Sequence, residues 1–489
     1  MAAFLSAAGG KTDNVYSRKF RHNRFREYIY KKWRDGMDQN TNHYLAEEKI
    51  GKLMLKFSVP CIMSLLVSAL YNIVDQIFIG RGVGYLGNGA TNVVFPITII
   101  ALAIALMIGD GCAAYLSICQ GKKDAESAHR SVGNAVLVLV TFGVLLTLFF
   151  ALMKEHVLAA FGATENNIEF AREYFDYILI GLPFYIFGNA VNSVIRADGS
   201  PQYAMFSTLV GCILNVILDP IAIFVLGWGM RGAALATIAG QIVTAVLAVF
   251  YLTRMKAVQL KKSSFRLSAR LLKQILPLGI SSFLTQMSIV AIMGVMNNVL
   301  VSYGAQSKYG ADIPLTVVGI VMKVFQIVIS VVVGIAAGSQ PIVGYNYGAG
   351  KKQRVKEIYA VMIRAEIVVG VIATIAFEVF PLQIIGIFGS ESVLYNEFAV
   401  LAFRIYLCTM ILCCVQKSTS IFLQSLGKPI MSLGLSLLRD FVLSIPMVLI
   451  FPKFFGLIGA LYSAPAADAI SLIAVILMMR SVYRELNQD

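Results

Sequence analysis

The segment "SVGNAVLVLVTFGVLLTLFFALM" (131–153) contains no charged side chain. About 20 apolar residues in helical form span the hydrocarbon core of a bilayer. A second segment of this kind, "GAALATIAGQIVTAVLAVFYL" (232–252), lies further along the chain. Because lipid cannot hydrogen-bond to open backbone groups, such segments predict membrane-spanning helices.

The whole chain has the composition of a protein embedded in lipid. Its 489 residues are 58% apolar and 14% charged, with a mean hydropathy of +0.74, whereas soluble proteins average about 45–50% apolar and about 25% charged. The sequence therefore predicts an all-α membrane protein with twelve transmembrane helices. The expected helices cover 55–79, 92–118, 131–153, 174–195, 203–226, 232–253, 271–301, 314–338, 358–383, 399–424, 430–452 and 456–479.

The net charge of +14 indicates topology rather than nucleic-acid binding, because the basic residues gather in the N-terminal tail and in alternate loops. Cytoplasmic loops carry an excess of Lys and Arg. Applied here, this rule places both termini in the cytoplasm. Residues 1–50 are expected to form a basic cytoplasmic tail that is partly disordered or lies on anionic lipid, and residues 481–489 a short C-terminal tail. Residues 1–50 lack the pattern of a signal peptide.

Repeated motifs divide the helices into two groups of six. Four pairs of motifs occur in the same order in both halves, and the offset between partners is nearly constant after the first pair. The pairs are "LKFSVP" (55–60) with "LKQILP" (272–277), "GKK" (121–123) with "GKK" (350–352), "GSP" (199–201) with "GKP" (427–429), and "GAAL" (232–235) with "GALY" (459–462).

The repeats predict a molecule of two similar lobes. Each repeat contains six helices, an even number, so both repeats insert the same way round. We expect two pseudo-symmetric lobes, an N-lobe (51–253) and a C-lobe (271–480), joined by a basic cytoplasmic linker (254–270).

Asp75 is the first ionisable side chain predicted inside the membrane. A charged residue at a helix centre costs roughly 2.5–3.5 kcal/mol, so it needs a reason to be there. Tyr71 lies one turn earlier on the same helical face, in "ALYNIVDQIFIG". This polar face points inward if it is functional; the alternative is an interfacial carboxylate that reaches lipid headgroups.

Asp219 is the second, in "CILNVILDPIAIF", with Asn215 one turn earlier. Pro220 cannot donate to the helix ladder and so frees backbone carbonyls about one turn before it. Carboxylate, amide and carbonyl oxygens suit a hard cation. Thr237 of the next helix adds an oxygen, and Asn189 and Asn192 share a face of the preceding helix. The alternative is a capping or kink network without an ion.

The second repeat does not contain this acidic cluster. At the repeat offsets, Asp219 corresponds to Met447 and Asp75 to Ile292. A purely structural device would tend to appear twice, so we place cation coupling in the first half.

The C-lobe has ionisable residues of its own. Lys323 is interpreted either as a cation of the central cavity or as a member of a structural ion pair. Arg439 and Asp440 are adjacent, about 100° apart on an α-helix, and are not expected to pair easily with each other. In the N-lobe, Asp110 is interpreted as a gate or a helix-end contact rather than as part of the ion site.

The sequence lacks several common motifs of soluble enzymes. No CxxC pair occurs, the four histidines form no HExxH-type site, and "GYNYGAGKKQ" has the wrong spacing for a phosphate-binding loop. Neither a metal site of that kind nor an ATP site is expected, so no cofactor beyond the coupling ion is predicted. If the protein is a transporter, its energy would then come from an ion gradient, unless a partner supplies ATP.

At these residues the chain resembles the MATE (multidrug and toxic compound extrusion) family. The matching pieces are "YNIVDQIFIGR", "NVILDP", Asn189, Asn192 and Thr237, over residues of roughly 50 to 480. The resemblance implies a V of two six-helix bundles. It also implies a cation site at Asp75, Asn215, Asp219 and Thr237, suited to Na⁺ or H⁺, in a cavity lined by Tyr71, Asn189 and Asn192.

The leading hypothesis is a secondary active antiporter that exports cationic amphipathic compounds in exchange for Na⁺ or H⁺. We expect it in a bacterial plasma membrane, as a monomer surrounded by lipid, with small-molecule substrates and without nucleic acid. One alternative is a lipid-linked saccharide flippase of the same superfamily, which would need a strongly basic cavity. A more remote alternative is a membrane-embedded enzyme, for which no nucleophile–base constellation is visible.

Overall fold

The computed structural model describes residues 42–161, 167–387 and 392–487. The predicted basic tail therefore lies mostly outside the described residues. From Asn42 the chain forms a short 3₁₀ turn, η1 (His43–Ala46), and then enters the first long helix.

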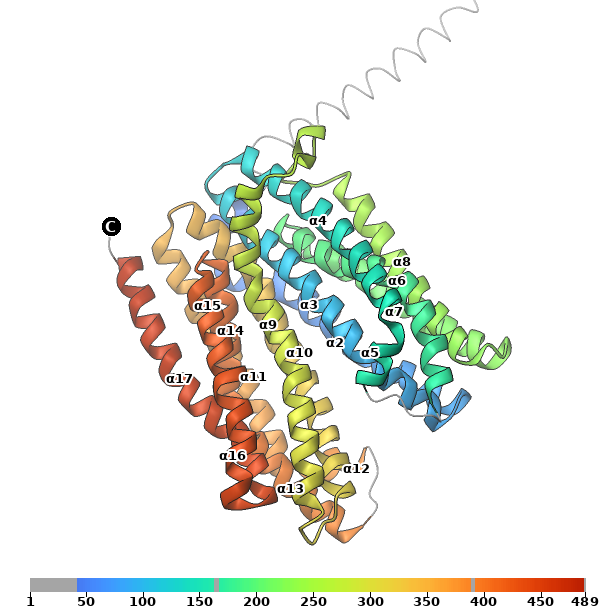
Figure 1. The fold of residues 1–489 in the computed structure, drawn as a ribbon. Coiled ribbons are helices and arrows are strands. Elements are labelled where there is room, and N and C mark those ends of the chain that lie inside the picture. The colour runs from blue at the N-terminus through green and yellow to red at the C-terminus, as the bar shows by residue number, and fades with distance from the viewer. Residues whose placement is uncertain (1–41, 162–166, 388–391, 488–489) are drawn as a thin grey trace, which may run out of the picture.

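The helices of the first repeat form one lobe, on the right of Figure 1. Near its end, the helix that carries Asp219 passes into a π-helical turn, η2 (Ile221–Val225). The α-helices of this N-lobe are α2 (Ile50–Gly82), α3 (Tyr85–Gly121), α4 (Ala125–Leu152), α5 (Lys154–Ala160), α6 (Ile168–Ala197), α7 (Pro201–Pro220) and α8 (Gly229–Leu252).

The helices of the second repeat form the other lobe, after a linker that contains a 3₁₀ turn, η3 (Lys262–Phe265). A second π-helical turn, η4 (Leu438–Ser444), interrupts one of its helices. The α-helices of this C-lobe are α9 (Ala269–Gly304), α10 (Asp312–Gly348), α11 (Lys352–Val379), α12 (Pro381–Gly386), α13 (Val393–Tyr406), α14 (Met410–Ser425), α15 (Pro429–Leu437), α16 (Ile445–Phe455) and α17 (Leu457–Asn487).

The helices long and apolar enough to cross a membrane agree with the predicted fold class. Eleven such spans occur among the described residues, and a twelfth results when α13 and α14, which meet at a bend of 47°, are counted as one. The sequence predicted a single helix over 399–424, without this break. Several helices also extend well beyond their apolar windows; α10, predicted over 314–338, continues to Gly348.

The two lobes repeat the same order of elements. One constant offset relates α3 to α10 at both ends (85 to 312 and 121 to 348) and α4 to α11 at both ends (125 to 352 and 152 to 379). The starts of the short helices α5 and α12 (154 and 381) are related by the same offset. This agreement between helix bounds supports the duplication that the motifs indicated.

The lobes touch at one end and separate at the other, which gives the V seen in Figure 1. Glycines permit the contact: a side chain on Gly338 of α10 would meet Ser58 Cα of α2 at 2.6 Å, and one on Gly279 of α9 would meet the carbonyl oxygen of Met107 of α3. We call this the basic end, because it carries Lys52, Lys122, Lys351 and both ends of the described chain. The other is the open end.

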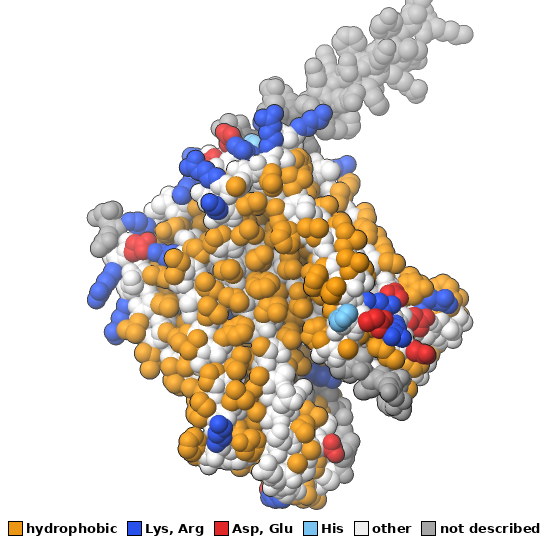
Figure 2. Space-filling view, in the orientation of Figure 1, with side chains coloured by type: hydrophobic (Ala, Val, Ile, Leu, Met, Phe, Trp, Pro, Cys, Tyr) orange, Lys and Arg blue, Asp and Glu red, His pale blue; other side chains and the backbone are white. Residues whose placement is uncertain are grey.

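The surface between the two ends is apolar. Figure 2 shows hydrophobic side chains over the sides of the bundle and Lys and Arg gathered at the basic end. Large side chains such as Leu148 and Ile372 are more than half exposed there. Such a belt is what a bilayer-spanning helix bundle presents to lipid.

Candidate functional site

Asp75 and Asp219 meet in the core of the N-lobe. Asp75 of α2 is 8% exposed and Asp219 of α7 is fully buried, and α2 packs directly against α7. Their carboxyl groups lie within hydrogen-bonding reach of each other. The inward-facing alternative of the sequence analysis is therefore the one that the structure contains.

Asn215 and Thr237 complete this group. In the amide orientation that satisfies both its oxygen and its nitrogen, Asn215, one turn before Asp219, donates to Asp219 Oδ2 at 3.2 Å. In the same orientation, its oxygen accepts from the Thr237 hydroxyl of α8 at 3.2 Å. Asp75, Asn215, Asp219 and Thr237, which come from three helices, are thus neighbours, and η2 begins two residues after Asp219.

The two carboxyl groups are incompletely satisfied. Oδ1 of Asp75 and Oδ1 of Asp219 are both buried and accept no hydrogen bond within the described part of the chain. Two ionised carboxylates within hydrogen-bonding reach of each other in a low-dielectric site repel strongly. The arrangement therefore favours a bound proton or cation between the carboxyl groups, and its free oxygens are donors that a hard cation accepts.

Two tyrosines lie near the acidic pair. Tyr71, one turn before Asp75 on α2, is part-buried and lies within electrostatic range of Asp75. Tyr174 of α6, which the sequence analysis did not single out, lies within range of both carboxylates and contacts Thr237. Nothing in the local sequence marks Tyr174, because its neighbours are ordinary helix residues; only the packing of α6 against α8 brings it to the site.

Asn189 and Asn192 belong to other hydrogen-bond groups in this structure. Asn189 donates to the backbone oxygen of Tyr185 at 2.9 Å. Asn192 donates to Ala204 O and Thr208 Oγ1 of α7, and its side-chain oxygen accepts from Arg196 at 2.8 Å. Asn192 is thereby connected to a network nearer the basic end rather than to the acidic pair.

That network joins the lobes through Asp110. Oδ1 of Asp110, on α3, accepts from Ser193 of α6 at 2.7 Å, and Oδ2 accepts from Ser282 of α9 at 2.9 Å. Arg196 lies 3.7 Å from the same carboxylate. Gln424 of α14 donates to Ser282 at 3.3 Å. Asp110 therefore contacts both lobes where they close.

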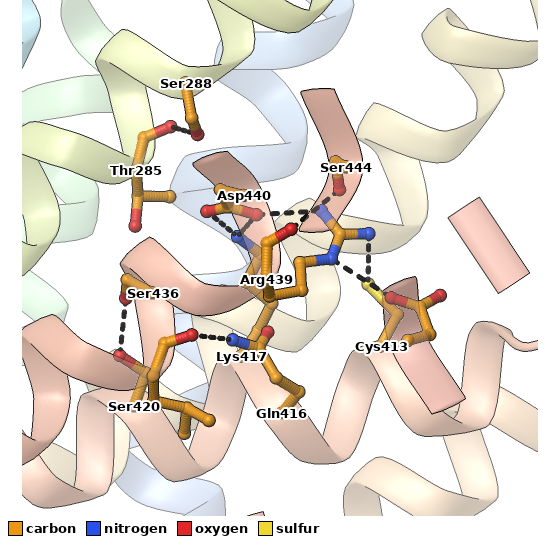
Figure 3. A network of polar contacts seen from close by, with 12 residues as sticks. Thr285, Ser288, Cys413, Gln416, Lys417, Ser420, Ser436, Arg439, Asp440 and Ser444 are labelled. Atoms are coloured by element: carbon orange, nitrogen blue, oxygen red, sulfur yellow. Dashed lines mark hydrogen bonds and ion pairs between the residues drawn. The ribbon is translucent and has the colours of Figure 1, made fainter. Parts of the chain in front are cut away.

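The C-lobe holds a buried network of four charged side chains (Figure 3). Asp440 accepts from Lys417 at 2.8 Å and from Arg439 at 2.9 Å. The Arg439 Nε donates to Asp468 at 3.0 Å, and Thr409 donates to the other oxygen of Asp468 at 2.9 Å. Two positive and two negative groups balance one another.

The expectation that Arg439 and Asp440 do not readily pair was wrong. Both lie in η4, where the wider π-helical turn alters the angle between successive side chains and brings the guanidinium to the neighbouring carboxylate. Close by, Glu366 of α11 is fully buried and accepts from Ser418 at 2.6 Å.

Lys323 stands apart from this network. It is exposed near the middle of α10 and makes no ion pair with a described residue. The structural pair that the sequence left open as its alternative role is therefore absent from the part of the chain that the structure describes.

Comparison with known proteins identifies the family. The sequence profile of the MatE family matches residues 60–221 and 277–450, one match in each lobe. The chain belongs to the MatE family. The resemblance to MATE transporters that the sequence predicted is thereby confirmed, as is the two-lobe fold class.

Relatives of this MatE chain carry a named activity. The chain is similar to the multidrug export protein MepA of Staphylococcus saprophyticus. The two are 25% identical over 452 residues, which cover 91% of this chain and 97% of the relative. MepA of Staphylococcus aureus (strain N315) is 23% identical over 448 residues, with the same coverage.

Solved structures give the same picture of the fold. An outward-facing multidrug resistance MATE family transporter of the MOP superfamily has a TM-score of 0.84 and 25% identity, and the match covers 91% of this chain and 98% of that one. A MATE crystal structure in the bent conformation has a TM-score of 0.83 and 25% identity at the same coverage.

Proposed function

We propose that this chain is a secondary active exporter of cationic amphipathic compounds, driven by exchange for Na⁺ or H⁺. The observation that carries the proposal is the buried pair Asp75 and Asp219, whose two unpartnered oxygens face a site of otherwise neutral groups. The multidrug export named for the MepA relatives supports the substrate class.

The proposed mechanism is competition for negative charge. With both carboxyl groups ionised, the N-lobe favours a positively charged guest. Asp75 and Asp219 then accept a proton or coordinate Na⁺ with help from Asn215 and Thr237, and the electrostatic attraction for the drug falls. Asp75 lies on α2 and Asp219 on α7, so the repulsion between their ionised carboxylates acts between these two packed helices. Neutralisation of the carboxylates also removes that repulsion.

The proposed orientation puts the basic end in the cytoplasm. Lys and Arg surround the ends of the described chain there, as the positive-inside rule requires of cytoplasmic segments. The V then opens toward the outer face of a bacterial plasma membrane, which is the arrangement expected just before a drug is released. The protomer is proposed to act as a monomer in lipid.

The two alternatives have less support. A flippase for pyrophosphate-linked saccharides needs a strongly basic cavity, whereas the N-lobe of this chain holds the buried acidic pair. A membrane-embedded enzyme needs a nucleophile–base or metal constellation at membrane depth; among the described residues, no group of three or more His, Cys, Asp or Glu is placed to hold a metal.

The test is ethidium efflux from vesicles with the Na⁺ and H⁺ gradients imposed separately. D75N and D219N should each abolish gradient-driven efflux, because one carboxylate alone no longer attracts the coupling ion. D176N is the matched control, since Asp176 is an exposed carboxylate paired with Lys154. Undiminished gradient-driven efflux by D75N would contradict the coupling role.

A further inference from the structure

A line of exposed residues runs along the half of α10 that lies nearer the open end. Exposure recurs every three or four residues, which is the spacing of one helical face. The members of this polar stripe are Asp312, Thr316, Gly319, Lys323 and Gln326. Four of the five side chains are polar, in a helix that is otherwise strongly apolar.

The polar stripe faces the cleft between the lobes. Lys323 and Gly334 are eleven residues apart, close to three full turns at about 3.6 residues per turn. Gly334 contacts α2 of the N-lobe, where a side chain on it would meet Ile62 Cα at 2.7 Å. The same face therefore packs against the N-lobe near the basic end, and its residues from Gln326 to Asp312 are exposed, in the part of α10 where the lobes diverge (Figure 1).

Register places Lys323 at the depth of the acidic pair. On the antiparallel helices α10 and α2, Gly334 opposes Ile62 and Gly338 opposes Ser58. Continuing that register by eleven residues on each helix brings Lys323 opposite residue 73, two positions from Asp75. At about 1.5 Å of rise per residue, the difference in depth is about 3 Å.

The two lobes thus place opposite charges on the two sides of the cleft. Asp75 and Asp219 are buried within the N-lobe on one side of it, and on the other side the exposed Lys323 has no ion-pair partner among the described residues. Two cations in the interior of the C-lobe, Lys417 and Arg439, are already paired with Asp440 and Asp468. Lys323 has no such partner among the described residues and is exposed, so it is available to a ligand in the cleft.

We infer that Lys323 recognises an anionic group of the substrate, so that the preferred cargo is an amphipathic cation that also carries a carboxylate. Such a zwitterion would place its positive group toward the N-lobe acids and its carboxylate toward Lys323. A purely cationic dye gains the first interaction and is repelled by the second wall. This inference rests on the proposed export function and specifies its substrate class.

The test compares two dyes that differ in one group. Rhodamine 110 has a free carboxylate, and rhodamine 123 is its methyl ester; binding to the purified full-length protein is followed by fluorescence anisotropy. K323Q should weaken rhodamine 110 binding about tenfold, the equivalent of one charge-assisted contact, and should tighten rhodamine 123 binding. K323R should keep the preference of the wild type, because the charge is retained.

The control is K453Q, which makes the same change of charge at an exposed position near the end of α16 and should leave the ratio of the two affinities as in the wild type. Equal shifts for both dyes in K323Q, no shift for either, or failure of the wild type to bind rhodamine 110 would overturn the inference. Gradient-driven efflux of rhodamine 123 by the wild type reports separately on the export function, which can fail while the change in preference persists.

Discussion

Ser282 of α9 donates a hydrogen bond of 2.9 Å to Asp110 of α3, and so connects the C-lobe to the N-lobe at the basic end. The other oxygen of Asp110 accepts from Ser193 within its own lobe. The two lobes of the V are therefore joined by a hydrogen bond at the end opposite the open end. An exporter that alternates its access must break this contact when the basic end opens.

Replacing Ser282 with Ala should favour opening at the basic end. The substitution leaves Asp110 Oδ2 without its donor, which costs roughly 1–3 kcal/mol in the closed arrangement. Cys61 of α2 is a native reporter, because it is buried and lies within electrostatic range of Asp110 and Arg196. We expect faster maleimide labelling of Cys61 in S282A, measured by peptide mass spectrometry.

Cys408 is exposed and provides the internal reference for this labelling. Its rate should be the same in S282A and in the wild type. Equal Cys61 rates in the two proteins would show that the Asp110–Ser282 contact does not hold the lobes together.

The acidic pair should link stability to its coupling ion. A ligand that binds only the folded state at ten times its Kd stabilises by about 1.4 kcal/mol. If Na⁺ is the ion, replacing choline chloride with NaCl should raise the melting temperature of the purified protein. D75N and D219N should lose this response, whereas D176N should keep it.

If H⁺ is the ion, the melting temperature of the wild type should not change with Na⁺ and should vary with pH. The melting temperature of D75N should depend less on pH. Variants of Asp75 and Asp219 that respond to both Na⁺ and pH as the wild type does would contradict the proposed site.

The C-lobe network should be far more sensitive to the loss of one member than an exposed ion pair. R439M leaves Asp468 buried without its cation, and breaking a buried pair in this way costs about 3–5 kcal/mol. The exposed pair of Arg172 and Glu155 is the comparison. R172M should lower the free energy of unfolding by at most about 1 kcal/mol. Chemical unfolding in detergent measures both.

Restoring the charge balance should recover stability. The double variant R439M/D468N removes one charge of each sign and should be more stable than R439M alone. A double variant less stable than either single variant would mean that Arg439 contributes mainly through packing.

Lys123, in the turn between α3 and α4, should be replaceable by Gly with a gain in stability. It is the one described non-glycine residue with positive φ, at 60°. At the offset that relates the bounds of α3 and α4 to those of α10 and α11, rather than at the offset of the two GKK motifs, it corresponds to Gly350, with φ 72°. Left-handed backbone costs a side-chain-bearing residue roughly 1–2 kcal/mol. K123G should raise the melting temperature, whereas K122G, at φ −74°, should lower it or leave it unchanged.

The loop contact of Asp198 should depend on pH. Asp198 follows α6 and accepts from Tyr251 Oη at 2.7 Å, from Lys256 N at 2.7 Å and from Ala257 N at 3.0 Å. Burial raises the pKa of Asp198 to about 6, whereas an opened loop would return it to its ordinary value near 4. The closed loop therefore binds a proton more tightly, and closure weakens as the pH rises from about 4 to about 6.

Hydrogen exchange of the Lys256 and Ala257 amides, corrected for intrinsic rates, tests this dependence. Protection should fall across that interval and level off above it. D198N, which cannot ionise, should show no such change. Protection that instead increases with pH in the wild type would refute the assigned direction.

How much the sequence could reveal differs between the fold and the site. Apolar windows such as 131–153 and 232–252 predicted spanning helices, because the requirement to cross lipid acts locally on each segment. The bend between α13 and α14 and the π-helical turn η4 were not predicted, since they depend on packing. The unpredicted pairing of Arg439 with Asp440 is a direct consequence of that turn.

By itself, the sequence determined that the chain folds as helices in lipid, that two repeats follow each other, and that Asp75 and Asp219 are costly residues in need of partners. Only the tertiary structure decided which helices meet: that Tyr174 joins the acidic pair, that Asn192 turns to Arg196, and that Lys323 faces the cleft. The reason is physical. Hydrophobic matching to the bilayer is set within one segment, whereas the partner of a buried charge is set by segments far away along the chain.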